Sequence, residues 1–201
     1  DGVQEVSLAC LKFLEHCNDP QHHLRHLSEH DAVMQYGLAR GFAIRQGLER
    51  EGLIEIRPIK TGQRGGGVKT VVITDKGYRV LEKLGIKASR PKGKGSVDAQ
   101  FWQYAIARHL QRKQPGAVIT IEGRRGDKAV DVLCEHEGKT TAYEVELSNK
   151  HVSQNVLKDL LVAGCDEVVI CVLRTQDREA AERAIGRGSP LFDKPSDLSR
   201  V

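Results

Sequence analysis

Two glutamates stand one residue apart in the segment AYEVELSNK, which spans residues 142–150. The β-branched and apolar neighbours of this pair predict a strand, and side chains two residues apart on a strand share a face. Glu144 and Glu146 are therefore expected to face the same side of a sheet. Like charges placed side by side destabilise a sheet, so a pair of this kind needs something that offsets it.

A third acid comes from the preceding strand-like segment, residues 128–135. Between that segment and 140–147, the residues HEGK predict a tight turn centred on Glu137 and Gly138. A two-residue loop would place Asp131 opposite Glu144, with Glu146 on the same face. Three carboxylates together predict a Mg²⁺ or Mn²⁺ site, with Asp131 and Glu144 as metal ligands, because these ions prefer hard oxygen ligands.

Two alternatives to a metal ion remain open. The acids could be protonated, with raised pKa values. They could also be neutralised by basic residues nearby in the sequence, namely Lys128, Lys150, Lys158, Arg124 and Arg125.

The elements that would position these acids form a mixed α/β pattern. One almost fully apolar strand follows a helix, which favours a buried central sheet. The expected elements are a helix over 97–112, strands over 117–122, 128–135 and 140–147, a helix over 150–163, a strand over 167–173 and a helix over 177–185.

The first half of the chain predicts three helices and a β-hairpin. An apolar helical pattern begins at Val6, a second helix is expected around 22–29, and a longer helix follows Gly37 and ends at Gly52. Strands at 55–60 and 68–74 flank a glycine-rich tip, and a last helix covers 75–85. This is the layout of a winged helix-turn-helix. The predicted DNA contacts are Arg40, Arg45, Arg50, Arg64 and Lys69, although a solvated surface used for protein contacts is the alternative.

Positive charge is concentrated in the later part of the first half and in the stretch that follows it. Residues 57–95 contain only two acids, Asp75 and Glu82, whereas residues 96–201 are nearly neutral. The stretch KASRPKGKG at 87–95 predicts a linker. We therefore expect a domain at 1–86, a linker at 87–96, a domain at 97–187 and a flexible tail at 188–201. The basic residues of 57–95 are Arg57, Lys60, Arg64, Lys69, Lys76, Arg79, Lys83, Lys87, Arg90, Lys92 and Lys94.

The cysteines and histidines give weaker signals. Five cysteines without a CxxC pair predict neither a disulfide framework nor a zinc ribbon, and a reduced, cytoplasmic setting is expected. A spacing of four relates His22, His26 and His30, but finger-like partners are absent, so a structural metal is not expected there. No membrane span or signal peptide is visible. The start at Asp1 suggests a piece of a longer protein.

The second half resembles the PD-(D/E)xK nuclease family, through Asp131, the Glu144-Val145-Glu146 segment and the flanking helices. The resemblance implies that Asp131 and Glu144 bind the metal, and that the domain is restriction-endonuclease-like with the order αβββαβ. Glu146 stands where the family usually has its catalytic lysine. The expected catalytic set is Asp131, Glu144, Glu146 and Lys158, and the additional candidates are Glu122, Gln103 and Gln154.

A wider resemblance covers the whole chain. The segments 36–54, 73–85, 93–103 and 144–160 are similar to the C-terminal region that follows the motor in some HerA/FtsK-like ATPases. This chain contains no GxxxxGK[ST] motif, so the resemblance implies an ATPase domain elsewhere in a longer chain. Two functions remain open: a metal-dependent DNA nuclease, and a non-catalytic DNA-binding or partner-docking module of an ATPase or translocase.

Overall fold

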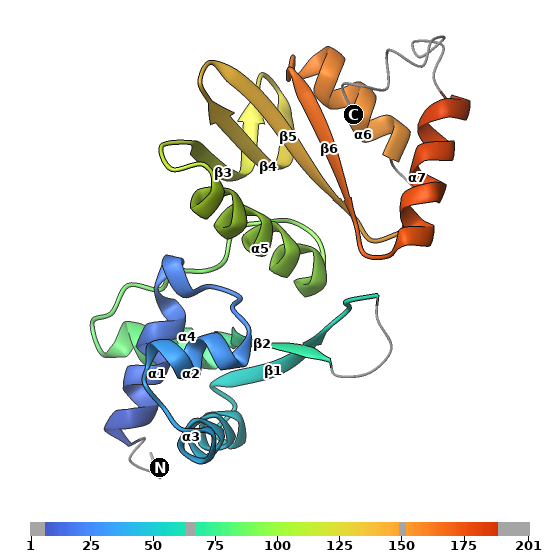
Figure 1. Cartoon of the computed structure of the whole chain (residues 1–201). Helices are drawn as coiled ribbons and strands as arrows, with labels where there is room; N and C mark the ends of the chain where they lie inside the picture. Colours follow the sequence, from blue (N-terminus) through green and yellow to red (C-terminus); the bar gives the residue numbers. More distant parts are fainter. Residues whose placement is uncertain (1–6, 63–66, 149–151, 189–201) are drawn as a thin grey trace. The chain divides into compact units, whose positions relative to one another are not determined.

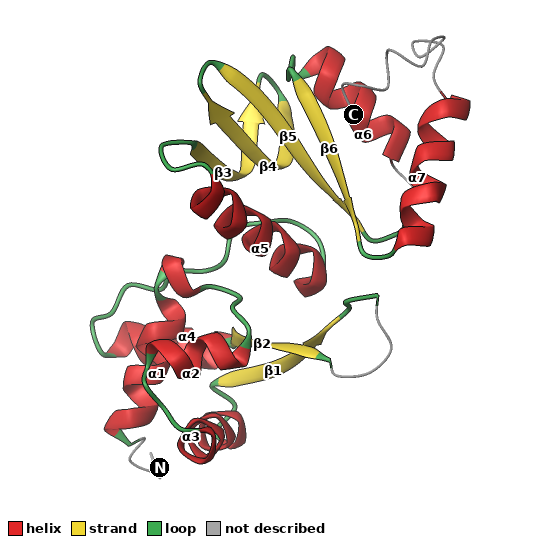
Figure 2. Cartoon of the chain, viewed as in Figure 1, coloured by secondary structure: helices red, strands yellow, loops and turns green. Residues whose placement is uncertain are grey.

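The computed structural model describes residues 7–62, 67–148 and 152–188, and the chain divides into two compact units (Figures 1 and 2). Unit 1 comprises residues 1–60 and 65–91, and unit 2 comprises residues 61–64 and 92–201. The mixed α/β class predicted from the sequence is confirmed. None of the helices in the described ranges is long and apolar enough to span a membrane.

Unit 1 consists of four helices and a two-stranded antiparallel sheet. Its strands pair from Ile54 opposite Ile73 to Ile59 opposite Val68. A single apolar core, with Phe13, Leu14 and Leu48 at its centre, joins the helices to the sheet. The elements are α1 (Leu8–Asn18), a 3₁₀ turn (Pro20–His22), α2 (Leu27–Val33), α3 (Leu38–Arg50), β1 (Ile54–Ile59), β2 (Val68–Ile73) and α4 (Asp75–Lys83).

The second helix differs from the prediction of a helix around residues 22–29. A 3₁₀ turn begins at Pro20, and α2 begins only at Leu27, after His26 accepts a hydrogen bond from the backbone N–H of Ser28 at its N-terminus. His22, His26 and His30 therefore do not share a helical face. Instead, His30 meets His16 of α1, with 3.1 Å between Nδ1 and Nε2.

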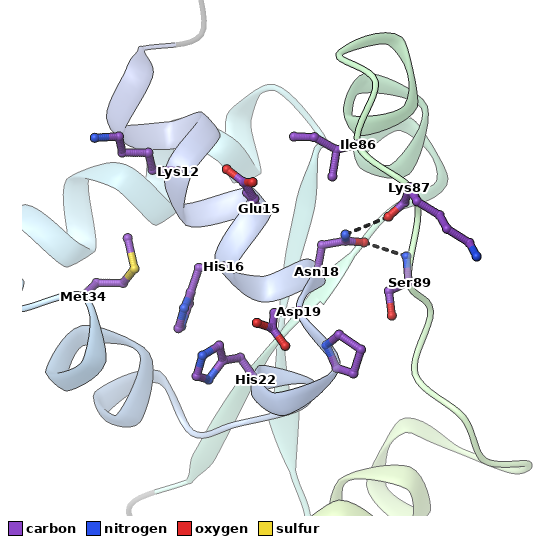
Figure 3. Close-up of a pocket in the computed structure, with 11 residues that line it drawn as sticks. Lys12, Glu15, His16, Asn18, Asp19, His22, Met34, Ile86, Lys87 and Ser89 are labelled. Carbon is purple, nitrogen blue, oxygen red and sulfur yellow. Dashed lines mark hydrogen bonds between the residues drawn. The ribbon is translucent and has the colours of Figure 1, made fainter.

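The predicted linker at 87–96 is held by hydrogen bonds at both of its ends. In unit 1, the side chain of Asn18 donates to the carbonyl of Lys87 at 3.0 Å and accepts from the backbone N–H of Ser89 at 2.7 Å (Figure 3). In unit 2, the backbone N–H of Lys92 donates to the hydroxyl of Tyr104 at 2.8 Å. Part of the backbone of the predicted linker is therefore fixed by side chains of the two units.

Unit 2 is built on a four-stranded sheet with the order β3-β4-β5-β6. Strand β4 is antiparallel to both β3 and β5, and β6 pairs with β5 in parallel. The elements are α5 (Val97–Lys113), β3 (Val118–Arg125), β4 (Lys128–His136), β5 (Lys139–Glu146), α6 (Val152–Leu157), a π-helical turn (Lys158–Val162), β6 (Glu167–Val172) and α7 (Thr175–Gly188).

Helices cover both faces of this sheet (Figure 1). On one face, Leu110 of α5 packs with Val132 and Cys134. On the other face, residues of α6 and α7 pack with Leu133 and Ala142. The sheet is therefore buried on both sides, which explains why its strands lack a simple alternation of polar and apolar residues.

The turn between β4 and β5 sets the register of the site. His136 pairs with Lys139, so the loop consists of Glu137 and Gly138, and both have positive φ values of 51° and 77°. This is the conformation of a type I′ hairpin turn, which matches the right-handed twist of the strands. The predicted two-residue loop is confirmed, and it places Asp131 beside Glu144.

Candidate functional site

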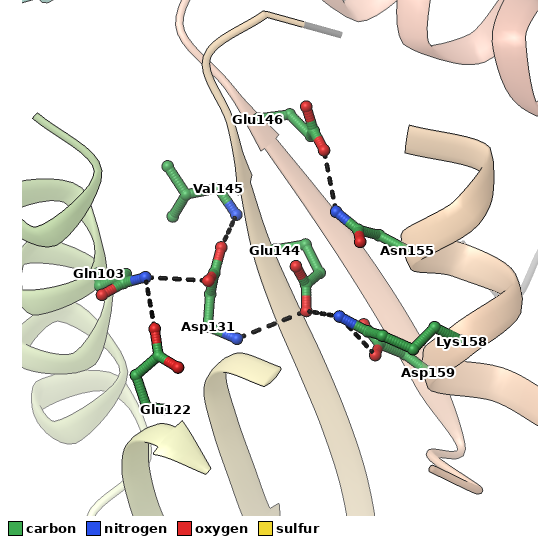
Figure 4. A network of polar contacts seen from close by, with 9 residues as sticks. All are labelled: Gln103, Glu122, Asp131, Glu144, Val145, Glu146, Asn155, Lys158 and Asp159. Atoms are coloured by element: carbon green, nitrogen blue, oxygen red, sulfur yellow. Dashed lines mark hydrogen bonds and ion pairs between the residues drawn. The ribbon is translucent and has the colours of Figure 1, made fainter. Parts of the chain in front are cut away.

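Glu122 of β3, Asp131 of β4 and Glu144 of β5 lie at neighbouring positions on three adjacent strands (Figure 4). Strand β3 pairs with β4 at Ile121–Val132 and at Gly123–Val130, which sets Glu122 beside Asp131. Glu122 has a φ of +52°, a left-handed conformation that few non-glycine residues adopt. Local irregularities of this kind are common next to functional sites because they redirect side chains.

The ladder between β4 and β5 opens at Asp131. The last paired residues are Val132 and Tyr143, and beyond them the backbone N–H of Val145 donates to Oδ2 of Asp131 at 2.8 Å. The backbone N–H of Asp131 in turn lies 3.4 Å from Oε1 of Glu144. Side chains thus replace backbone carbonyls as acceptors, and this separates the two strands at the acids.

Asp131, Glu144 and Glu146 were predicted to share one face of the sheet, and for Asp131 this prediction was wrong. Its Oδ1 accepts from Nε2 of Gln103 on α5 at 2.9 Å, whereas Glu144 and Glu146 contact the segment that contains α6. The alternation of faces is interrupted here, since Val130 packs in the cluster of α6 and α7 while Val132 packs against α5. Periodicity alone assumes an unbroken ladder, and the opening at Asp131 breaks it.

Gln103 links Asp131 to Glu122. Its Nε2 lies 2.9 Å from Oδ1 of Asp131 and 3.5 Å from Oε1 of Glu122, which also accepts from the backbone N–H of Lys94 at 2.8 Å. The side chain of Gln103 is 1 % exposed. Both additional candidates from β3 and α5 thus lie next to Asp131, and the amide holds the two acids at a fixed separation.

Lys158 reaches the carboxylate of Glu144. Its Nζ lies 3.0 Å from Oε1 of Glu144 and 3.3 Å from Oδ1 of Asp159. Lys158 and Asp159 are adjacent at the start of the π-helical turn, a form of helix that is rare and frequently occurs at functional sites. The turn brings two successive side chains to the same carboxylate.

Asp159 is a site residue that the sequence did not reveal. Its side chain is fully buried, and its Oδ1 lies 3.3 Å from the ammonium group of Lys158, which Glu144 shares. Nothing in the sequence distinguished it from a surface acid, because a regular helix would turn Lys158 and Asp159 in different directions. The deviation into a π turn has no signature in the sequence.

Glu146 is buried and is held by Asn155 of α6, whose Nδ2 donates to Oε1 at 2.9 Å. Sequence reasoning selected the neighbouring Gln154, which is exposed. Asn155 and Lys158 are three residues apart, a spacing that places both on the same side of a helix. That spacing was the available signal for Asn155.

Burial and mutual repulsion raise the pKa values of the acids. Burial, followed by the charge of Glu144, raises the pKa of Asp131 from 3.8 to about 6. Burial, followed by the nearby Asp159, raises the pKa of Glu144 from 4.5 to about 7, although Lys158 acts in the opposite direction. The pKa of Asp159 is also raised, mainly by burial. One lysine is therefore insufficient to stabilise all of these carboxylates in their charged form.

The carboxyl groups available to a divalent cation at this site are few. Within the described ranges, no three His, Cys, Asp or Glu side chains gather closely enough to hold a metal ion together. Mg²⁺, however, is usually bound by one or two carboxylates and keeps several waters. Asp131 and Glu144 supply two carboxylates on adjacent strands, and the excess of negative charge favours a cation.

The basic residues predicted to contact DNA differ in exposure. Arg40, Arg50 and Lys69 are exposed in unit 1, and the guanidinium of Arg40 lies 5.0 Å from the centre of the Tyr36 ring. Arg45 is buried and pairs with Asp31 of α2, so we remove it from the proposed DNA contacts. The helical spacing was the available signal, because Gly41, Ile44, Arg45 and Leu48 follow the i, i+3, i+4, i+7 pattern of one buried helix face. Arg64 lies outside the described residues.

Comparison with known proteins gives no family for this chain. No family model matches it, and no curated protein matches it. Among solved structures, it is similar to the crystal structure of protein VC1899 from Vibrio cholerae, with 11 % sequence identity and a TM-score of 0.34. The alignment covers 91 % of this chain and 51 % of that one, so this chain spans about half the length of VC1899.

Proposed function

We propose that unit 2 is a metal-dependent nuclease domain of the PD-(D/E)xK type and that unit 1 is a winged helix that binds DNA. One observation carries the first part. The backbone pairing of β4 and β5 stops at Asp131 and Glu144, and Lys158, from a π-helical turn, contacts the carboxylate of Glu144. Two acids and a lysine at a break in a sheet suit phosphodiester hydrolysis. A structural core would keep the ladder intact and avoid the raised pKa values.

Asp131 and Glu144 would be the metal ligands. A Mg²⁺ or Mn²⁺ ion there supplies Lewis-acid chemistry, because it offsets phosphodiester charge and lowers the pKa of water. Gln103 holds Asp131 and Glu122 in place, and Asn155 holds Glu146. Lys158 would stabilise the negative charge that develops on the phosphate, the role left open by the glutamate at position 146.

A metal titration followed by thermal unfolding tests the ligand assignment. Mn²⁺ bound only by the folded protein should raise the unfolding temperature. Asp131→Asn and Glu144→Gln should lose that response, and both variants should be more stable than the wild type without metal, since each removes a member of a repelling group. An Asp131→Asn variant that is less stable without metal, with an unchanged response to Mn²⁺, would contradict the assignment.

Cleavage of DNA tests the catalytic part. Activity should require Asp131 and Glu144, and Lys158→Ala should lower it by ~10²-fold or more. The matched control is Lys139→Ala, which removes another lysine–carboxylate contact, 2.9 Å from Glu167, on an exposed surface. Equal activity of the two lysine variants would show that Lys158 does not act in the reaction.

A non-catalytic module is the second candidate, favoured by the contacts that the acids already make. Lys158, Gln103 and Asn155 each donate to one of them without any metal. In that case Mn²⁺ leaves stability unchanged and cleavage is absent, while DNA binding persists. The ATPase domain implied by the wider resemblance remains a proposed partner in the same chain.

The DNA-binding part rests on the exposed basic residues of unit 1. Neutralising a phosphate contact should reduce the salt dependence of binding by about one unit of slope. We therefore expect Arg40→Ala and Lys69→Ala to flatten the plot of affinity against salt. The control is Lys83→Ala, which removes an exposed lysine at the end of α4, outside α3 and the β-hairpin. Binding that does not depend on salt would refute this part.

A further inference from the structure

Helix α3 carries basic residues, yet part of its solvent-exposed surface is apolar. Leu38 is 84 % exposed and Phe42 is 62 % exposed, and Ala39 and Ala43 are exposed beside them. The opposite face is buried and contains Gly41, Ile44, Arg45 and Leu48. We call Leu38, Ala39, Phe42 and Ala43 the apolar face of α3.

This arrangement is fixed by packing beneath the helix. Gly41 lies directly against the carboxylate of Asp31, and Arg45 pairs with the same carboxylate one turn further on. These contacts prevent α3 from rotating to bury its apolar face in unit 1. The face is therefore presented to solvent in a defined orientation.

The exposed polar side chains of α3 lie at the borders of its apolar face. Gln46 and Arg50 follow it on the exposed side of α3, and Arg40 lies at its border with its guanidinium over Tyr36. Glu49 is drawn toward the sheet, since its Oε1 accepts from the backbone N–H of Ile56 at 3.2 Å. The surroundings are suited to a polyanion. In the first two turns of α3 the only exposed side chain that can donate a hydrogen bond is that of Arg40, whose guanidinium lies over the Tyr36 ring at the border of the apolar face.

We infer that α3 reads A·T base pairs in the major groove of duplex DNA through thymine methyl groups and one adenine contact. This inference rests on the DNA binding proposed above. The first residues of a recognition helix contact base edges, and apolar side chains there match only the C5 methyl group of thymine. The polar edges of G·C pairs would lose water without gaining a partner. Gln46, further along the same face, has the amide that pairs with adenine.

Selection from a pool of random duplexes by the whole protein tests the inference. The enriched duplexes should share a short A·T-containing motif. Replacing its thymines by deoxyuridine removes only methyl groups and should weaken binding about fourfold for each contacted methyl. Gln46→Ala should reduce discrimination about tenfold at a single base pair, whereas Arg40→Ala should weaken all sequences alike.

Phe42→Ala provides the decisive variant, because an exposed side chain can be removed without harming the core. It should lose sensitivity to deoxyuridine at one position and keep the salt dependence of binding. The matched control is Leu84→Ala, which removes a 53 % exposed leucine from the same unit and should change neither property.

The possible failures separate this inference from the proposed function. Salt-dependent binding with no motif, with a G·C motif, or without any effect of deoxyuridine would overturn the reading of bases by α3 and leave DNA binding standing. Concentration-dependent self-association that Phe42→Ala abolishes, combined with unaltered DNA binding, would assign the apolar face to protein contacts instead. Absence of any DNA binding would overturn both proposals.

Discussion

Acidification from pH 7 to pH 5 should weaken unit 1 and strengthen unit 2. In unit 1, burial, followed by the charge of His16, lowers the pKa of His30 from 6.5 to about 3. Burial, followed by His22, lowers the pKa of His16 to about 4. His16 and His30 contact each other through ring nitrogens at 3.1 Å, and His22 stacks on His16 with ring centres 4.0 Å apart, so the folded state requires neutral rings.

The direction in which the stability of unit 1 changes with pH depends on whether the folded or the unfolded state binds more protons. Between pH 6.5 and about 4, the unfolded chain protonates these histidines while folded unit 1 does not, so the free energy of unfolding falls as the pH falls. Each pH unit in that window is worth up to about 1.4 kcal/mol per histidine. His16 contributes less because it is only half-buried, and we expect a loss of roughly 2 to 4 kcal/mol between pH 7 and pH 5.

Unit 2 should respond in the opposite direction. Asp131 and Glu144 have folded pKa values of about 6 and about 7, above their values of 3.8 and 4.5 in the unfolded chain. Folded unit 2 therefore takes up protons that the unfolded chain does not. Its free energy of unfolding should rise by roughly 1 to 3 kcal/mol between pH 7 and pH 5, in the absence of metal.

Urea unfolding at pH 5, 6 and 7 measures both responses in one sample. The fluorescence of Trp102, the chain's only tryptophan, reports on unit 2, and amide NMR signals report on each unit separately. His30→Gln should reduce the pH dependence of unit 1 only, and Asp131→Asn that of unit 2 only. Parallel changes in the two units, or a constant stability of unit 1, would refute the reasoning.

Three further changes test individual contacts. Gly41→Ala should destabilise unit 1 by about 1 to 3 kcal/mol in thermal unfolding, because the new Cβ would overlap the carboxylate of Asp31. The control is Gly47→Ala in the same helix, where the new Cβ meets only ordinary contacts, and this variant should be as stable as the wild type or more stable. Asp159→Asn should stabilise metal-free unit 2, because burial disfavours the charged carboxylate of Asp159 and Lys158 keeps its ion pair with Glu144. An unchanged or lower midpoint in urea would contradict this. Gln103→Ala should destabilise unit 2 by about 1 to 3 kcal/mol, as measured by Trp102 fluorescence.

The sequence predicted those parts of the fold that depend on local signals. The type I′ turn at Glu137 and Gly138 needs one glycine and fixes the register of two strands, so Asp131 could be placed beside Glu144 in advance. Lys158 was one of several basic residues considered near the acids, and the structure places its Nζ 3.0 Å from Oε1 of Glu144. The turn and the register it fixes depend on a few neighbouring residues.

The remaining features arise from tertiary contacts that override local pattern. Its charge predicts that Arg45 lies at the surface, but its side chain is buried because it pairs with the carboxylate of Asp31. The helix expected around residues 22–29 gives way to a 3₁₀ turn and a later start of α2, where the ring of His26 caps the helix. The direction of Asp131 depends on Gln103, which is 28 residues earlier in the chain.

The glutamate at position 146 and the lysine at position 158 are best understood together. Glu146 accepts a hydrogen bond from the side chain of Asn155. Lys158 lies three residues after Asn155, and its ammonium group contacts Glu144 instead. Glu144 raises the pKa of Lys158, although half-burial of the amine acts against this, so the lysine stays charged at neutral pH. A cation is thus supplied next to the acids from the helix. Under the proposed function, Lys158 takes the role that PD-(D/E)xK nucleases give to a lysine on the strand, and position 146 can then carry a glutamate.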